Sequence, residues 1–217
     1  MDRCRTKPRL KSVKAGPDSR PIAVLIGPTC SGKTGLAVSL AARMVEKGVS
    51  LEVIGADARQ IYRGISVGTA KPTPDERASV HHHMLDVADP GEVFSAARFA
   101  REARGSVEGV YRRGGLPLVV GGSGLYIRAL LEGLFEGPDA QPALRQELEN
   151  AADRIGASAL HQRLESIDPE AAVRIHPNDR KRIIRAIEVF EATGRPISAL
   201  RREECESGFI RPLYIGI

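Results

Sequence analysis

Residues 27–34, with the sequence GPTCSGKT, are those whose types and spacing point most directly to chemistry. They fit the phosphate-binding pattern G-x-x-x-x-G-K-[ST] at every fixed position. Glycines let such a loop curl so that its backbone N–H groups point inward, and the dipole of the following helix adds partial positive charge. Lys33 is expected to reach the outer phosphates of a ligand, and the Thr34 hydroxyl to ligate Mg²⁺. We therefore predict a site for a di- or triphosphate.

The segments around this loop have the patterning of an α/β fold. Residues 22–26 are an apolar run typical of a buried parallel strand, and residues 36–42 continue as a helix. Strands separated by helices imply a doubly wound parallel sheet, whose ligands bind at the carboxyl ends of the strands. Further strands are predicted at 51–55, 116–120 and 211–217. The residues predicted to bind the diphosphate or nucleotide are Gly27, Pro28, Thr29, Cys30, Ser31, Gly32, Lys33 and Thr34.

Composition divides the chain into four stretches. We expect a disordered basic tail over 1–20, a P-loop core over 21–137, a small helical insertion over 138–200, and a return to the core sheet over 201–217. Within the insertion, helices are predicted at 141–153, 157–166, 169–175 and 179–193. The chain ends on a strand, so we expect a C-terminal part of the protein to be missing.

The net charge of +5 arises in the tail. Residues 1–20 hold seven basic and two acidic residues, whereas the other 197 residues hold 25 of each sign. The high isoelectric point therefore does not by itself indicate a nucleic-acid-binding fold. No run of about 18 apolar residues is present, so no membrane segment is expected. Three scattered cysteines fit a reduced, cytoplasmic protein.

Asp57 follows the second predicted strand, where we expect it to lie beside the P-loop. A carboxylate there could accept a proton from an attacking nucleophile, and capping of a turn is the alternative role. Gln60 could bond both N6 and N7 of an adenine. The third strand ends in Gly121 and Gly122 instead of the Asp with which ATPases hold Mg²⁺, which argues against a motor or NTPase. Tyr126, just beyond, is a candidate donor to a ligand.

A second positive region lies within residues 174–202, which hold eight basic and three acidic residues. Arg182 and Arg185 are three positions apart and share one side of a predicted helix, whose apolar face includes Ile183 and Ile184. Contact with phosphate, of a leaving group or of RNA, is the functional interpretation. A solvated helical face is the alternative.

Three consecutive histidines, His81, His82 and His83, have the composition of a metal site. Neighbouring residues point to different sides of a chain, so we do not expect these three to converge on one ion. We predict loop structure or hydrogen bonding with Asp86 instead. The sequence also contains no CxxC pair, so we do not predict a zinc site.

Six motifs in one order make the chain resemble the tRNA dimethylallyltransferases, also called tRNA isopentenylpyrophosphate transferases. The likeness runs from about Pro21 to the end. The motifs occupy residues 27–34, 57–64, 68–72, 82–86, 121–126 and 178–189. The resemblance implies transfer of a dimethylallyl group from its diphosphate to N6 of the adenosine just 3′ of the anticodon. It also implies Mg²⁺ as cofactor, the tRNA anticodon arm as partner, no membrane, and a monomer.

The resemblance assigns roles to individual residues. Thr29 would hydrogen-bond the bridging oxygen of the diphosphate, Asp57 would take the N6 proton, and Arg182 would contact the far side of the diphosphate. The residues that it places against tRNA are Asp57, Ala58, Arg59, Gln60, Ser123, Lys181, Arg182, Ile183, Ile184 and Arg185. Ala58 stands where the family commonly has Ser, and Ser123 where it has Thr.

Three other functions stay open at this point. An adenylate isopentenyltransferase would prenylate free AMP or ADP, although the insertion and residues 68–72 favour tRNA. A P-loop small-molecule kinase also pairs this loop with an Asp after the second strand. A non-catalytic RNA-binding remnant is the third alternative.

Overall fold

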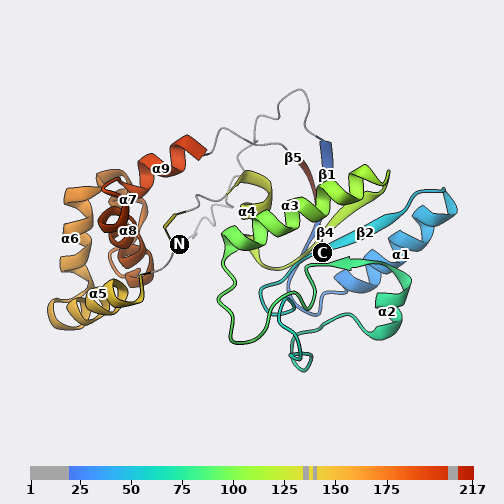
Figure 1. Cartoon of the computed structure of the whole chain (residues 1–217), viewed down its shortest axis with the longest axis horizontal. Coiled ribbons are helices and arrows are strands. Elements are labelled where there is room, and N and C mark those ends of the chain that lie inside the picture. Colours follow the sequence, from blue (N-terminus) through green and yellow to red (C-terminus); the bar gives the residue numbers. More distant parts are fainter. Residues whose placement is uncertain (1–19, 134–136, 139–140, 205–209) are drawn as a thin grey trace, which may run out of the picture. The chain divides into compact units, whose positions relative to one another are not determined.

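The structure is a computed structural model that describes residues 20–133, 137–138, 141–204 and 210–217. The chain forms two compact units, residues 1–133 with 207–217, and residues 134–206. Figure 1 shows a sheet flanked by helices in the first unit and a group of helices in the second. The predicted tail lies outside the described residues, apart from Arg20, which begins the first strand.

In the described residues, the first unit is built on a parallel sheet, as predicted, and the sheet has five strands, one more than we predicted. The strand order is β3-β2-β4-β1-β5. The strands are β1 (Arg20–Ile26), β2 (Leu51–Ala56), β3 (His82–His83), β4 (Leu116–Gly121) and β5 (Ile210–Gly216). Because β5 pairs with β1 along its whole length, the predicted return of the chain to the sheet is present.

The order of the strands in the sheet differs from their order along the chain. β4 lies between β1 and β2 and pairs with both. In the register, Gly121 of β4 pairs with Ile26 of β1 and with Ala56 of β2. The ends of the three strands are therefore level, so Asp57 still lies at the same edge of the sheet as the P-loop.

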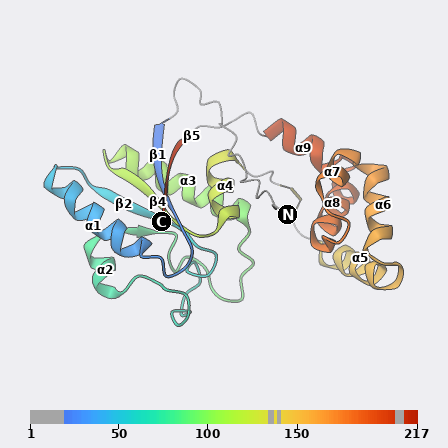
Figure 2. The ribbon, with the colours of Figure 1, turned by 180° about the vertical axis from the view of Figure 1, so that it is seen from behind.

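Helices cover both faces of this sheet (Figure 2). They are α1 (Lys33–Glu46), α2 (Pro74–Ser79), α3 (Ala96–Arg112) and α4 (Gly124–Glu132). Side chains alternate along each strand, so Val24 and Ile54 pack in the cluster that includes Phe99 of α3, while Leu25 packs with Ala37 of α1 on the other face. Burial on both faces explains the continuous apolar runs of the strands.

The region 63–92 is more regular than we predicted from its glycines and prolines. It contains α2 and the two-residue strand β3. Thr73 accepts a hydrogen bond from the Glu76 amide and Glu76 accepts one from the Thr73 amide, which is a capping box, and Pro74 occupies the first helical turn. This local signal was readable in the sequence, and we missed it.

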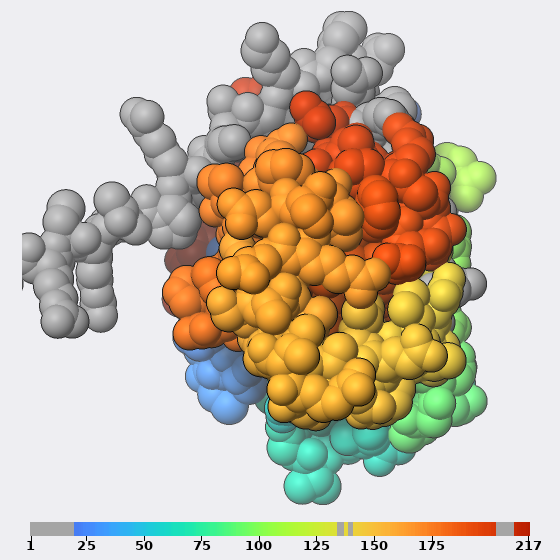
Figure 3. Space-filling view, turned by 90° about the vertical axis from the view of Figure 1, so that its left-hand side faces the viewer, coloured from blue at the N-terminus to red at the C-terminus, as the bar shows by residue number. Residues whose placement is uncertain are grey.

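The second unit consists of helices around its own apolar cluster, and in Figure 3 they pack into one continuous mass coloured yellow to red. The helices are α5 (Pro142–Ile155), α6 (Ala157–Ile167), α7 (Pro169–Arg174), α8 (Arg180–Thr193) and α9 (Ile197–Glu204). Leu148, Leu164 and Ile187 are central members of the cluster. We predicted the first four of these helices and missed α9.

Candidate functional site

The P-loop connects the end of β1 to the start of α1. Gly32, which caps the helix, has φ 89°, in the left-handed region that glycine adopts without strain. The Lys33 ammonium donates a hydrogen bond to the Gly27 carbonyl at 2.9 Å and another to the carbonyl of Pro28. The loop therefore winds around the lysine head group, while Thr29 is exposed to solvent. The half-buried Lys33 thus holds its positive charge within the loop itself.

The turn after β4 approaches the P-loop closely. A Cβ atom added to Gly122 would lie 3.1 Å from the Gly27 carbonyl oxygen. A Cβ atom at Gly121 would lie 2.1 Å from the carbonyl oxygen of Ala56, and the Ser123 amide donates to that same oxygen at 3.1 Å. Three turns therefore meet at the carboxyl edge of the sheet: the P-loop, the turn after β2, and the turn after β4.

Asp57 is half-buried at the start of the turn after β2. Its Oδ1 accepts hydrogen bonds from the Arg59 amide at 2.8 Å and the Gln60 amide at 3.3 Å. Within residues 20–133, no group hydrogen-bonds Oδ2. One oxygen therefore caps the turn, which is the alternative role that we weighed, and the other lies without a hydrogen bond from these residues and could accept a proton. Ala58 and Arg59 are exposed next to it.

Gln60 is held differently from our prediction. Its Nε2 donates hydrogen bonds to the carbonyls of Thr69 at 3.0 Å and Ala70 at 2.9 Å. An amide that bonds both N6 and N7 of adenine must donate to N7, and both amide hydrogens are already engaged. Only Oε1 remains, and it can accept a hydrogen bond from an exocyclic amine. As Gln60 is held here, it cannot make the two-bond contact with adenine that we predicted.

A partly buried charge network fixes the loops next to Asp57 and Gln60. The Lys71 ammonium, with a side chain only 3% exposed, lies 2.6 Å from Asp86 Oδ1, and Arg77 lies 2.9 Å from Oδ2. Burial alone would raise the pKa of Asp86, but the hydrogen bonds from Lys71 and Arg77 lower it below its usual value. The Asp86 amide donates to the Gln60 carbonyl at 3.2 Å. Asp86 thus pairs with these cations and not with a histidine, which corrects our prediction.

Tyr126 is part of the core and not a ligand donor as we expected. Its ring stacks on Phe99 with centroids 4.2 Å apart, and its hydroxyl donates to the Phe94 carbonyl at 3.3 Å. Burial, followed by the neighbouring Tyr62 and Asp57, raises the pKa of Tyr126 to about 12. Ser123, by contrast, is half-buried at the N-cap of α4, where its hydroxyl makes no capping bond.

The predicted tRNA contacts of α8 separate into surface and core residues. Lys181 and Arg182 are exposed, and the Arg182 side chain, 73% exposed, pairs with Asp179 at 3.3 Å. Ile183 and Ile184 are 0% and 3% exposed in the apolar cluster of the second unit. Their side chains have no surface to offer RNA, so this prediction is wrong for both.

Arg185 faces inward to a buried carboxylate that we missed. Glu188, 0% exposed, accepts hydrogen bonds from Arg185 at 2.8 Å, from Arg145 at 2.9 Å and from the Gln141 amide at 2.9 Å. Arg185 also donates to the Pro138 carbonyl at 3.1 Å. We expected Arg182 and Arg185 to act together on phosphate, but Arg185 neutralises Glu188 within its own unit.

Thr34 provides an oxygen ligand of the kind that Mg²⁺ prefers. It is half-buried in the first turn of α1, and its hydroxyl makes no hydrogen bond to any residue of the described ranges. The Thr34 hydroxyl is therefore suited to be one ligand of a hard divalent cation. None of the helices in the described part of the chain combines the length and apolarity of a membrane span.

Comparisons with known proteins agree on one family. A family model described as IPP transferase matches residues 60–217. A tRNA dimethylallyltransferase 2 of Geotalea uraniireducens is 49% identical over 92% of this chain and 62% of its own length. The chain spans about three fifths of the length of the curated relatives it matches.

Two solved structures are also similar. A tRNA isopentenylpyrophosphate transferase from Bacillus halodurans is 42% identical, with a TM-score of 0.51 over 81% of this chain and 57% of its own. A eukaryotic dimethylallyltransferase described as acting on tRNA is 28% identical, with a TM-score of 0.74 over 91% of this chain and 48% of its own.

Proposed function

This chain belongs to the IPP transferase family, and we propose that it forms the catalytic part of a tRNA dimethylallyltransferase. The reaction joins N6 of the adenosine 3′ to the anticodon to the dimethylallyl carbon. The bond from that carbon to the diphosphate oxygen breaks, and diphosphate leaves. The observation that carries the proposal is the meeting of the P-loop, the Asp57 turn and the glycine turn after β4 at one edge of the sheet.

The P-loop holds the leaving group. An exocyclic adenine amine is a poor nucleophile, so the allylic C–O bond stretches early and negative charge develops on the diphosphate. The Lys33 ammonium and the loop amides stabilise that charge as it forms. The Thr29 hydroxyl, exposed on the loop, bonds the bridging oxygen. Thr34 would hold Mg²⁺, which when bound adds positive charge beside the phosphates.

Asp57 removes the proton from N6. Its Oδ1 is held by two backbone amides, which fixes the carboxylate and leaves Oδ2 to accept the proton. The Oε1 atom of Gln60, left over after both amide hydrogens are engaged, accepts the other N6 hydrogen. Together, these two side chains recognise an amine rather than a hydroxyl or a carbonyl.

The tRNA contacts that remain are on exposed residues. Lys181 and Arg182 present two positive charges at the start of α8, where they bind phosphate of the anticodon arm. Ala58, Arg59 and Ser123 contact the adenosine as it approaches Asp57. The adenosine must leave its stack to reach Asp57. We further propose that the protein acts as a cytoplasmic monomer.

One experiment tests the proposal. The purified protein, alone and with the C-terminal sequence of a relative appended, is incubated with labelled dimethylallyl diphosphate and either tRNA or AMP. Labelling of tRNA at N6 supports the proposal. Labelling of AMP alone would favour the adenylate enzyme. Phosphate release from ATP, without prenyl transfer, would favour a kinase and overturn it.

A further inference from the structure

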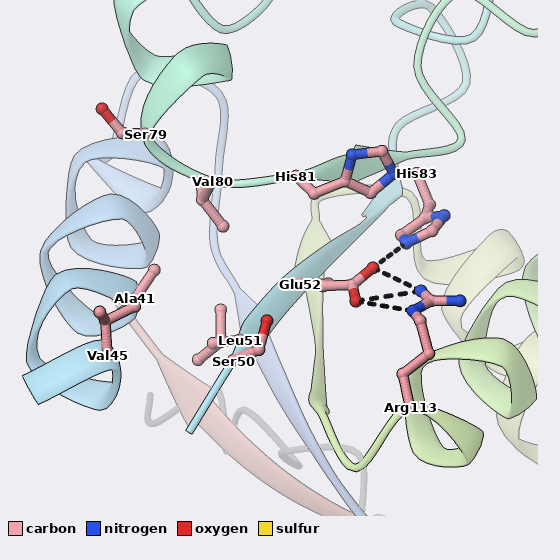
Figure 4. A pocket seen from close by; sticks show the side chains of 10 residues that line it. All are labelled: Ala41, Val45, Ser50, Leu51, Glu52, Ser79, Val80, His81, His83 and Arg113. Atoms are coloured by element: carbon pink, nitrogen blue, oxygen red, sulfur yellow. Dashed lines mark hydrogen bonds and ion pairs between the residues drawn. The ribbon is translucent and has the colours of Figure 1, made fainter. Parts of the chain in front are cut away.

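A cluster of metal-binding side chains lies outside the proposed active site. Glu52, His81 and His83 each present one ligand atom, and these atoms all lie within 4.8 Å of one another. Figure 4 shows the His81 ring beside His83, and Glu52 between His83 and Arg113. Glu52 is the second residue of β2, so it lies near the amino ends of the strands, whereas the P-loop follows a carboxyl end.

The alternation of an extended chain brings the two histidines together. β3 pairs with β2 in parallel, with His82 opposite Val53. His81 and His83 are two positions apart and lie on one side, with ring centroids 4.4 Å apart. The His82 ring instead engages the Val80 carbonyl at 2.8 Å. Our objection to a three-histidine site therefore holds for His82, while the carboxylate from β2 takes its place.

We propose that Glu52, His81 and His83 bind a divalent transition metal of the Zn²⁺ type. Two imidazole nitrogens, one carboxylate oxygen and a water make a four-coordinate set that suits Zn²⁺. The second carboxylate oxygen keeps a partner, because Glu52 Oε1 accepts a hydrogen bond from Arg113 at 3.0 Å. Hydrogen bonds of this kind orient the ligands of metal sites.

The metal requires the ligand atoms, which now lie within 4.8 Å of one another, to shift by up to about 1.5 Å to reach tetrahedral spacing. His83 Nε2 lies 2.6 Å from Glu52 Oε2. Metal–ligand bonds of about 2.0–2.1 Å in a tetrahedron separate neighbouring ligands by about 3.3 Å. The hydrogen bond between His83 and Glu52 therefore lengthens by less than an ångström, and the neutral imidazole that binds the ion through Nε2 carries its hydrogen on Nδ1. Arg113 releases Oε2 and keeps Oε1, which its 57% exposed side chain permits.

Solvent reaches the cluster. An open cavity of about 480 Å³ adjoins it, lined by all three ligands and by Ser50, Ser79 and Arg113. A hydrated ion can enter there, and the fourth position can hold water. Glu52 is in β2, His83 is in the edge strand β3, and His81 directly precedes β3, so a bound ion would fasten that edge strand to the sheet.

Metal titration of the protein, stripped of metal with a chelator, tests this proposal. We expect one equivalent of Zn²⁺ to bind and raise the thermal midpoint, and Co²⁺ to give the visible absorption of a tetrahedral site. His81→Ala removes a direct ligand. Loss of a residue that only hydrogen-bonds a ligand weakens metal binding by about 10- to 100-fold, so we expect His81→Ala to weaken Zn²⁺ binding by at least that factor. His81 is exposed, so this variant keeps the fold.

Two controls make the result specific. His82→Ala removes a neighbouring imidazole that does not face the cluster, and it should bind Zn²⁺ as the parent does. Thr34→Ala removes the proposed Mg²⁺ ligand in the P-loop and should also leave Zn²⁺ binding unchanged. The proposal is overturned if no stoichiometric binding occurs, if His81→Ala binds like the parent, or if either control weakens binding as much as His81→Ala.

Discussion

Replacement of Asp57 by Asn tests the proposed proton acceptor with little change to the structure. Asn Oδ1 can still accept the two amide hydrogen bonds that Arg59 and Gln60 donate to Asp57. The turn after β2 should therefore keep its shape. What changes is the second atom, because an amide nitrogen replaces Oδ2 and cannot take a proton.

The size of the effect follows from that single change. General-base catalysis contributes about 10²- to 10⁴-fold, which corresponds to roughly 3–5 kcal/mol of transition-state stabilisation. We expect kcat for tRNA prenylation to fall by that factor. Affinity for dimethylallyl diphosphate should stay within a few-fold of the parent, because the variant removes no positive charge from the P-loop.

Single-turnover transfer and calorimetric binding of dimethylallyl diphosphate separate these two quantities. Asp89→Asn is the matched control, since Asp89 is an exposed carboxylate that pairs with Arg63. Transfer by Asp57→Asn within a few-fold of the parent would refute the assignment. Equal losses of transfer, diphosphate binding and thermal stability would show that Asp57 acts only by capping its turn.

Three further outcomes are expected. Lys33→Ala should slow transfer more than it weakens diphosphate binding, because charge develops on the leaving group; equal losses in rate and binding assays would contradict this. Removing residues 1–19 should reduce tRNA affinity at low salt and leave turnover at saturating tRNA unchanged, which salt titrations can check. Burial favours a raised pKa for Glu188, but Arg185 and Arg145 lower it below 4.5, so its stabilising effect is present above that pH and is lost on acidification. The Glu188→Gln variant should therefore melt at a lower temperature than the parent at pH 7. Its melting temperature should fall less steeply than that of the parent as the pH is lowered from 5 to 3. If the melting temperatures of the two proteins fall in parallel with pH, this reasoning is refuted.

Local sequence signals were sufficient for the main elements and for the P-loop. The pattern of residues 27–34 is contiguous, and the strand and helix that flank it are apolar runs of ordinary length. The apolar spacing of Ile183, Ile184 and Ile187 also indicated a buried face, which should have removed the first two from the tRNA contacts.

Contacts between distant segments could not be predicted in this way. The place of β4 between β1 and β2 depends on crossovers that no local pattern encodes. The hydrogens of Gln60 are engaged by carbonyls nine and ten residues away, in a loop where Ala70 has φ 50°. Glu188 resembles a surface acid until Arg145, 43 positions earlier, is placed against it.

The contact between Gly121 and Ala56 has a consequence for how the protein tolerates substitution. A Cβ atom at Gly121 would come within 2.1 Å of the Ala56 carbonyl oxygen, so any other residue must push the end of β2 away from β4. Asp57 follows Ala56 directly and would move with it. In a mutational scan selected for activity, Gly121 should therefore be as intolerant as Asp57, although it contributes no reacting group. At this position, intolerance to mutation would result from the close approach of two backbones and not from a catalytic role.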